Sequence, residues 1–148
     1  MRRIFLVVDD REAEAARSRQ QLASIDPAAE ILCASSGSGA LALLESRRAV
    51  PSLIFADFFM PGMNGIELLA AIRQRPWLEG VRVAILSERP SDRDVLVSYR
   101  LGACAFLTKP VSLHEMRETV RDWARAAVEM ALGPVPATSA EEPGVNAA

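Results

Sequence analysis

The sequence contains few of the residues that stabilise secreted or zinc-binding proteins. Its 148 residues include two cysteines, Cys33 and Cys104, which are far apart and form no CxxC pair, and a single histidine. A disulfide framework or a structural zinc site is therefore not expected. The cysteine usage instead favours a reducing, cytoplasmic location.

Long apolar runs and an excess of positive charge are also missing. No apolar run approaches the roughly 18 residues that a membrane span needs, and the short run 4–8 passes directly into two acids, unlike a signal peptide. Seventeen basic and 19 acidic residues give a net charge of −2, so there is no basic field for nucleic acid. We expect neither a membrane nor DNA as a partner.

Five short apolar runs alternate with five helix-favouring segments. The patterns predict strands at 4–8, 30–34, 53–56, 81–86 and 105–108, and helices at 12–25, 37–47, 66–72, 92–101 and 113–131. Such alternation predicts an α/β fold, with a parallel sheet covered by helices on both faces. Its length fits one domain, residues 1–131, followed by a Pro/Ala-rich tail, residues 132–148, which we expect to be disordered.

Polar side chains stand where four of the five expected strands end. They are Asp9, Asp10, Asp57, Ser87 and Lys109. Functional sites in open parallel sheets form at the carboxyl ends of the strands. Each residue alone has an ordinary explanation as a helix cap, a turn residue or a solvated charge. Their coincidence at four strand ends predicts that they converge on one rim.

Three carboxylates at one rim would repel one another and raise their pKa values unless a cation relieved the repulsion. Mg²⁺ suits such a site because it prefers oxygen ligands. A carboxylate in these surroundings can attack phosphorus and form an aspartyl phosphate. The positive charge of Lys109 would then lie beside the phosphoryl oxygens, and Ser87 would donate a hydrogen bond to one of them.

These residues resemble the receiver domain of bacterial two-component response regulators, the CheY-like family. The resemblance rests on Val7-Val8-Asp9-Asp10, on the loop 57–65, which matches D-x-x-M-P-x-M-[DN]-G, on Ser87, and on the segment 106–110, whose Lys-Pro bond is typically cis in the family. It covers residues 3 to about 131. It implies a doubly wound (βα)5 fold of the flavodoxin/CheY type, with strand order 2-1-3-4-5.

The resemblance also implies a role for each matched residue. Asp57 accepts a phosphoryl group from the phosphohistidine of a sensor histidine kinase or phosphotransfer protein. Asp9, Asp10, Asp57 and the backbone carbonyl of Phe59 hold Mg²⁺. Lys109 pairs with the phosphoryl group, Ser87 moves to it, and Phe106 turns inward. The protein would catalyse only its own phosphorylation and dephosphorylation.

The implied output surface is built from residues 92–101, 105–108 and 113–131. A downstream protein target would bind there, and a homodimer would form through this surface or through the first and last helices. Because only the tail follows the matched region, we expect a single-domain regulator. The stretch 97–103 is similar to single-domain regulators paired with bacterial phytochrome kinases.

Two positions depart from the usual pattern of the family. Glu88 follows Ser87, where the family usually has a small residue, and its carboxylate would repel a phosphoryl group or control the access of water. Phe59, two residues after Asp57, would shield the acyl phosphate. We predict that Phe59 and Glu88 together set the rate of autodephosphorylation.

Two other functions fit parts of the sequence. A Mg²⁺-dependent phosphatase with an aspartate nucleophile resembles D-x-D-x-[TV] after the first strand, but here Asp10 is followed by Arg11-Glu12-Ala13. A degenerate receiver would act as a docking module that needs no phosphorylation. Glu88 favours that alternative, and the complete set of acids, serine and lysine argues against it.

Overall fold

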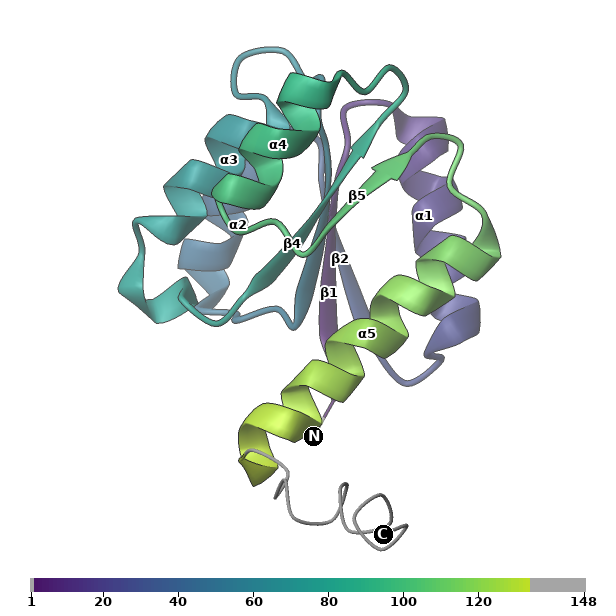
Figure 1. Ribbon diagram of the computed structural model, residues 1–148, viewed down its shortest axis with the longest axis vertical. Helices are drawn as coiled ribbons and strands as arrows, with labels where there is room; N and C mark the ends of the chain where they lie inside the picture. The colour runs from purple at the N-terminus through teal and green to yellow at the C-terminus, as the bar shows by residue number, and fades with distance from the viewer. Residues whose placement is uncertain (1, 134–148) are drawn as a thin grey trace, which may run out of the picture.

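The computed structural model describes residues 2–133, in which strands and helices alternate along the chain (Figure 1). Its elements are β1 (Ile4–Val8), α1 (Glu12–Ile25), β2 (Glu30–Ala34), α2 (Gly37–Arg47), β3 (Leu53–Asp57), α3 (Gly65–Arg73), the short 3-10 helix η1 (Pro76–Leu78), β4 (Arg82–Ser87), α4 (Asp92–Arg100), β5 (Ala105–Thr108) and α5 (Leu113–Leu132). All ten predicted elements are present, and no end differs from its predicted position by more than one residue.

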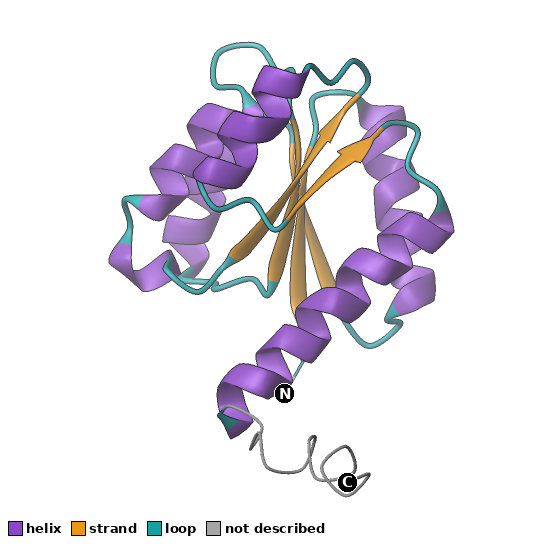
Figure 2. Cartoon of the chain, in the orientation of Figure 1, coloured by secondary structure: helices purple, strands orange, loops and turns teal. Residues whose placement is uncertain are grey.

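The five strands form one parallel sheet in the order β2-β1-β3-β4-β5. Helices α1 and α5 cover one face, while α2, α3 and α4 cover the other (Figure 2). The predicted fold class and strand order are therefore confirmed. Since every strand runs in the same direction, all five carboxyl ends lie along one rim of the sheet.

Successive residues of each central strand pack into two separate cores. In β1, Leu6 and Val8 join the core under α2 and α3, whereas Phe5 and Val7 join the core under α1 and α5. All five residues of β3 are buried. This burial on both faces explains why the strands are continuous apolar runs, and it fixes the register that places Asp57 at the rim.

Local sequence signals fix the ends of several helices. A capping box between Ser112 and Glu115 begins α5. A second capping box, between Asn64 and Glu67, begins α3 one residue earlier than the apolar pattern indicates. None of the described helices is long and apolar enough to cross a membrane. Helix α5 includes Leu132, and residues 134–148 of the expected tail lie outside the described residues.

Candidate functional site

The carboxyl ends of β1 and β3 bring three acidic residues together. Carboxylate oxygens of Asp9, Asp10 and Asp57 all lie within 4.8 Å of one another. Asp9 and Asp57 are buried, at 5% and 6% exposure, and Asp10 is exposed. The predicted convergence of these acids is confirmed. Three carboxylates supply only oxygen ligands, two of them partly withdrawn from water, and this donor set fits a hard divalent cation.

Lys109, the only lysine in the sequence, lies among the carboxylates. Its Nζ is 2.9 Å from Asp9 Oδ2, 3.0 Å from Asp57 Oδ1 and 2.6 Å from Glu14 Oε1. Burial of the ammonium lowers its pKa. The hydrogen bonds that it donates to the three carboxylates outweigh this effect and raise the pKa of Lys109 above its usual value. The lysine therefore stays charged at all physiological pH values.

The surroundings of Asp57 disfavour the ionised form of its carboxyl group. Burial raises the pKa of its carboxyl group above the usual value, and the neighbouring charges of Asp9 and Asp10 act in the same direction. The hydrogen bond and the charge of Lys109 oppose them but do not cancel them. An additional cation at the acids would therefore favour the ionised form of Asp57, which is the form that can act as a nucleophile.

The loop after Asp57 turns back closely beneath it. The amide of Gly65 donates a hydrogen bond to the carbonyl of Phe58. A Cβ atom at Gly65 would lie 2.6 Å from the carbonyl oxygen of Asp57, so only glycine allows this close approach. The side chain of Phe59 is 56% exposed, and its ring lies edge-on to that of Phe58 at 4.6 Å between centroids.

Ser87, at the end of β4, carries a buried hydroxyl group. Its side chain is fully buried, and Oγ makes no hydrogen bond with any residue of the described part, 2–133. Its carbonyl accepts a hydrogen bond from the amide of Lys109, which ties the ends of β4 and β5 together. A buried hydroxyl group without a partner costs free energy in this state of the protein. Another state in which it gains a partner would therefore be favoured.

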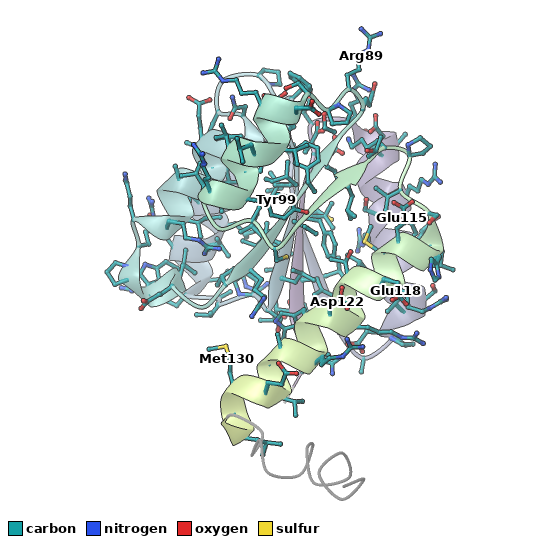
Figure 3. All side chains as sticks on the ribbon, viewed as in Figure 1. Arg89, Tyr99, Glu115, Glu118, Asp122 and Met130 are labelled. Atoms are coloured by element: carbon teal, nitrogen blue, oxygen red, sulfur yellow. The ribbon has the colours of Figure 1, made fainter. Side chains whose placement is uncertain are left out.

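Phe106 lies on β5, near the ring of Phe58 and the hydroxyl group of Tyr99. Its half-buried ring lies 6.4 Å from that of Phe58, between centroids. Its amide donates a hydrogen bond of 3.2 Å to the hydroxyl oxygen of Tyr99 on α4, which faces this edge strand (Figure 3). The peptide bond between Lys109 and Pro110 is cis, as predicted from the family resemblance.

Two residues of the site were not predicted from the sequence. Arg11 donates hydrogen bonds from Nη1 to Glu14, at 3.0 Å, and to Glu88. Glu14 therefore accepts from both Arg11 and Lys109, and these hydrogen bonds lower its pKa although burial acts against them. Only their positions in the sequence could have indicated that Arg11 and Glu14 belong to the site. Arg11 directly follows the acidic pair, and Glu14 lies in the first turn of the next helix.

Glu88 does not face Asp57 as an uncompensated charge, because its carboxylate is paired with Arg11. A cavity of about 280 Å³ opens between the loops at this rim, lined by Arg11, Asp57, Phe59, Glu88 and Arg89. Arg89 extends outward from the same rim (Figure 3). The nucleophilic candidate is thus reached through an opening whose border carries both positive and negative side chains.

Comparisons with known proteins agree with this geometry. The family model of the response regulator receiver domain matches residues 5–121. The response regulator Rcp1 of Synechocystis is 28% identical over 124 residues, which cover 80% of this chain and 84% of Rcp1. The response regulator GacA of Pseudomonas protegens is 32% identical over 117 residues, and the match covers 78% of this chain but only 53% of GacA.

Solved structures of the same kind superimpose on most of the chain. The chemotaxis protein CheY4 of Vibrio cholerae has 25% identity and a TM-score of 0.70, covering 82% of this chain and 98% of CheY4. The receiver domain of a response regulator, NarL, from Mycobacterium tuberculosis has 26% identity and a TM-score of 0.71, covering 84% of this chain and 97% of that domain.

Proposed function

The chain belongs to the response regulator receiver domain family, and on this premise we propose that it accepts a phosphoryl group on Asp57 from a histidine kinase or phosphotransfer protein. A receiver domain is a signalling module of two-component systems rather than an enzyme that turns over a separate substrate. One observation carries the proposal: the carboxylate of buried Asp57 lies 3.0 Å from the only lysine and within 4.8 Å of two further acids. At the end of the neighbouring strand, the buried hydroxyl of Ser87 has no hydrogen-bond partner among residues 2–133.

The proposed transfer uses the residues of this rim directly. A carboxylate oxygen of Asp57 attacks the phosphorus of the phosphohistidine, an O–P bond forms, the N–P bond breaks, and the imidazole leaves. Lys109, which is 3.0 Å from Asp57, balances charge on the phosphoryl oxygens. Attack by water on the same phosphorus later releases inorganic phosphate and restores the carboxylate.

Mg²⁺ is the proposed cofactor of this reaction. Asp9, Asp10, Asp57 and the backbone carbonyl of Phe59 would hold it, in keeping with the oxygen-only donor set of the acidic cluster. When bound, the ion would neutralise charge between the carboxylates and the incoming phosphoryl group. Asp9 also accepts a hydrogen bond of 2.9 Å from the amide of Arg11, which fixes its orientation at the rim.

Phosphorylation would be reported by Ser87 and Phe106. The Ser87 hydroxyl, which has no partner among residues 2–133, would gain one by donating a hydrogen bond to a phosphoryl oxygen. Phe106 would turn inward into the space that Ser87 releases, changing the surface formed by α4, β5 and α5. The hydrogen bond from the Phe106 amide to Tyr99 supports this coupling, because it ties β5 to α4.

The proposed partners of the chain are a downstream protein, a second copy of the chain and a kinase. We propose that residues 1–131 act as a receiver in the cytoplasm and bind a downstream protein through the α4, β5 and α5 surface. A homodimer would use the same surface or α1 and α5. The pairing with a phytochrome kinase that residues 97–103 suggest also remains a prediction.

The lifetime of the phosphorylated state would depend on Phe59 and Glu88, which both line the cavity at Asp57. We expect Phe59→Asn and Glu88→Ala to change the rate of autodephosphorylation, because each alters how water reaches the acyl phosphate. Loss of radiolabel from the purified phosphorylated protein measures this rate. Rates equal to that of the unsubstituted protein in both variants would reject the role of these two residues.

The proposed function is tested by beryllofluoride, a stable mimic of a phosphoryl group. Selective ¹³C labelling of lysine yields a signal from Lys109 alone, since the chain has no other lysine. We expect beryllofluoride to shift this signal only with Mg²⁺ present, and not in Asp57→Asn. No shift in the unsubstituted protein would favour a docking module without phosphorylation, and turnover of small phosphate esters would favour a phosphatase.

A further inference from the structure

Arg11 connects two loops across the opening above Asp57. The loop between β1 and α1 carries Arg11, and the loop between β4 and α4 carries Glu88, 77 residues away in the sequence. Their ion pair lies at the border of the cavity that contains Asp57. Both side chains are substantially exposed, at 58% and 48%, so the pair is not locked by packing and either partner can rotate away.

The backbone of Arg11 is fixed beside the site, and its exposed guanidinium is held there by ion pairs with Glu14 and Glu88. Its backbone amide donates a hydrogen bond of 2.9 Å to Asp9, one of the three clustered acids. The guanidinium is therefore anchored beside the site and reaches outward over the cavity. Because Arg11 and Asp57 line the same cavity, the guanidinium and an anion bound at Asp57 would share that space.

Phosphorylation would change which anion attracts Arg11 most strongly. Before it, Glu88 offers one negative charge at the border of the cavity, and Glu14 on α1 offers a second to the same Nη1 of Arg11. Afterwards, the phosphoryl group on Asp57 would place up to two negative charges in the same cavity, where they are less screened by water. A guanidinium also presents two parallel N–H donors that match two phosphoryl oxygens, a fixed geometry that an ammonium lacks.

We propose that Arg11 is a second cationic ligand of the phosphoryl group on Asp57, and that Glu88 holds its guanidinium at the cavity border until that group replaces it. This inference rests on the proposed function. Transfer of Arg11 would release the loop that carries Glu88 from the loop that carries the acids. The Glu88 carboxylate thereby acts as a competitor for Arg11, and only indirectly as a repelling charge.

A double-mutant cycle on beryllofluoride binding tests this exchange. Titrations in saturating Mg²⁺, followed by the ¹⁹F signal of the bound ligand, give the dissociation constant of each variant. We expect Arg11→Ala to weaken binding about fivefold or more, and Glu88→Gln to tighten it about threefold. In Arg11→Ala/Glu88→Gln, the Glu88→Gln change should have almost no effect. Arg11→Lys should restore part of the affinity, since it returns the charge without the paired donors.

Arg121→Ala is the matched control, because Arg121 is also exposed and paired on the surface, with Glu118 at 3.4 Å. It should bind as the unsubstituted protein does. Urea unfolding of every variant shows that each is folded in the titration. Equal tightening by Glu88→Gln with and without Arg11 would identify simple repulsion and overturn the exchange. Unchanged affinity in Arg11→Ala would overturn it as well, whereas failure of the proposed function would abolish binding in the unsubstituted protein.

Discussion

Replacement of Lys109 by methionine removes the cation that contacts the buried carboxylates of the rim. Methionine keeps a chain of similar length and volume, so the substitution changes charge more than packing. In the unsubstituted protein Lys109 contacts three carboxylates, those of Asp9, Glu14 and Asp57. Without it, Asp9 and Asp57 would face each other without this cation, and Glu14 would keep only its contact with Arg11.

The expected loss of stability follows from the burial of these groups. The side chains of Lys109, Asp9 and Asp57 are only 8%, 4% and 7% exposed. Removing one partner of such a buried ion pair costs about 3–5 kcal/mol. Glu14 is 31% exposed and keeps its contact with Arg11, so we expect the lower end, about 3 kcal/mol, at neutral pH.

Two further signatures distinguish this electrostatic cause from a packing defect. Without Lys109, the already raised pKa of Asp57 should rise further. A carboxyl group whose pKa is higher in the folded than in the unfolded state destabilises the fold when it is ionised. The loss of stability in Lys109→Met should therefore become smaller as the pH falls and Asp57 is protonated. Mg²⁺ should also stabilise Lys109→Met more than the unsubstituted protein, because it supplies the missing positive charge.

Urea unfolding followed by far-UV circular dichroism, with and without Mg²⁺ and at neutral and mildly acidic pH, measures all three effects. Arg121→Met, at an exposed ion pair, is the control and should change the free energy of unfolding by no more than about 0.5 kcal/mol. A loss below about 1 kcal/mol in Lys109→Met, with equal stabilisation of both proteins by Mg²⁺, would refute the reasoning.

Three smaller perturbations test other contacts of the site. Ser87→Ala should leave the free energy of unfolding unchanged or raise it by about 1 kcal/mol, because the buried hydroxyl has no partner in the described residues; a clear loss in urea unfolding would contradict this. Tyr99→Phe should speed amide hydrogen exchange at Phe106 and cost about 0.5–1 kcal/mol, since the amide loses its acceptor; unchanged exchange would argue against that bond. Glu14→Gln should lower the melting temperature at neutral pH. Since the pKa of Glu14 is lowered in the fold, its carboxylate stabilises the protein at neutral pH, and this stabilisation is lost as the pH falls through that pKa. A difference in melting temperature between the two proteins that stays constant down to acidic pH would exclude this cause.

The fold and the acidic cluster were accessible from the sequence because they depend on backbone direction. Short apolar runs that end in polar residues mark buried parallel strands, and parallel strands share a rim. Asp9 and Asp57 therefore had to meet once β1 and β3 were neighbours in the sheet. The order of the strands came from the resemblance to a family, since spacing alone does not determine which strands are adjacent.

The charge network around the cluster was not accessible in the same way. Arg11, Glu14 and Glu88 are long side chains whose contacts depend on rotamers and on the orientation of α1, which has a weak apolar stripe. The sequence indicated that Glu88 would act as a free negative charge near Asp57. Its pairing with Arg11 appears only when the loops after β1 and β4 are placed in three dimensions.

Covalent phosphorylation of the intact chain tests the central claim most directly. The protein is incubated with phosphoramidate, a small phosphoryl donor, with and without Mg²⁺, and the modified position is mapped by peptide mass spectrometry after borohydride trapping. The account predicts a single modification at Asp57 that requires Mg²⁺ and is absent from Asp57→Asn. No modification of the folded protein, or equal modification of Asp57→Asn, would contradict it.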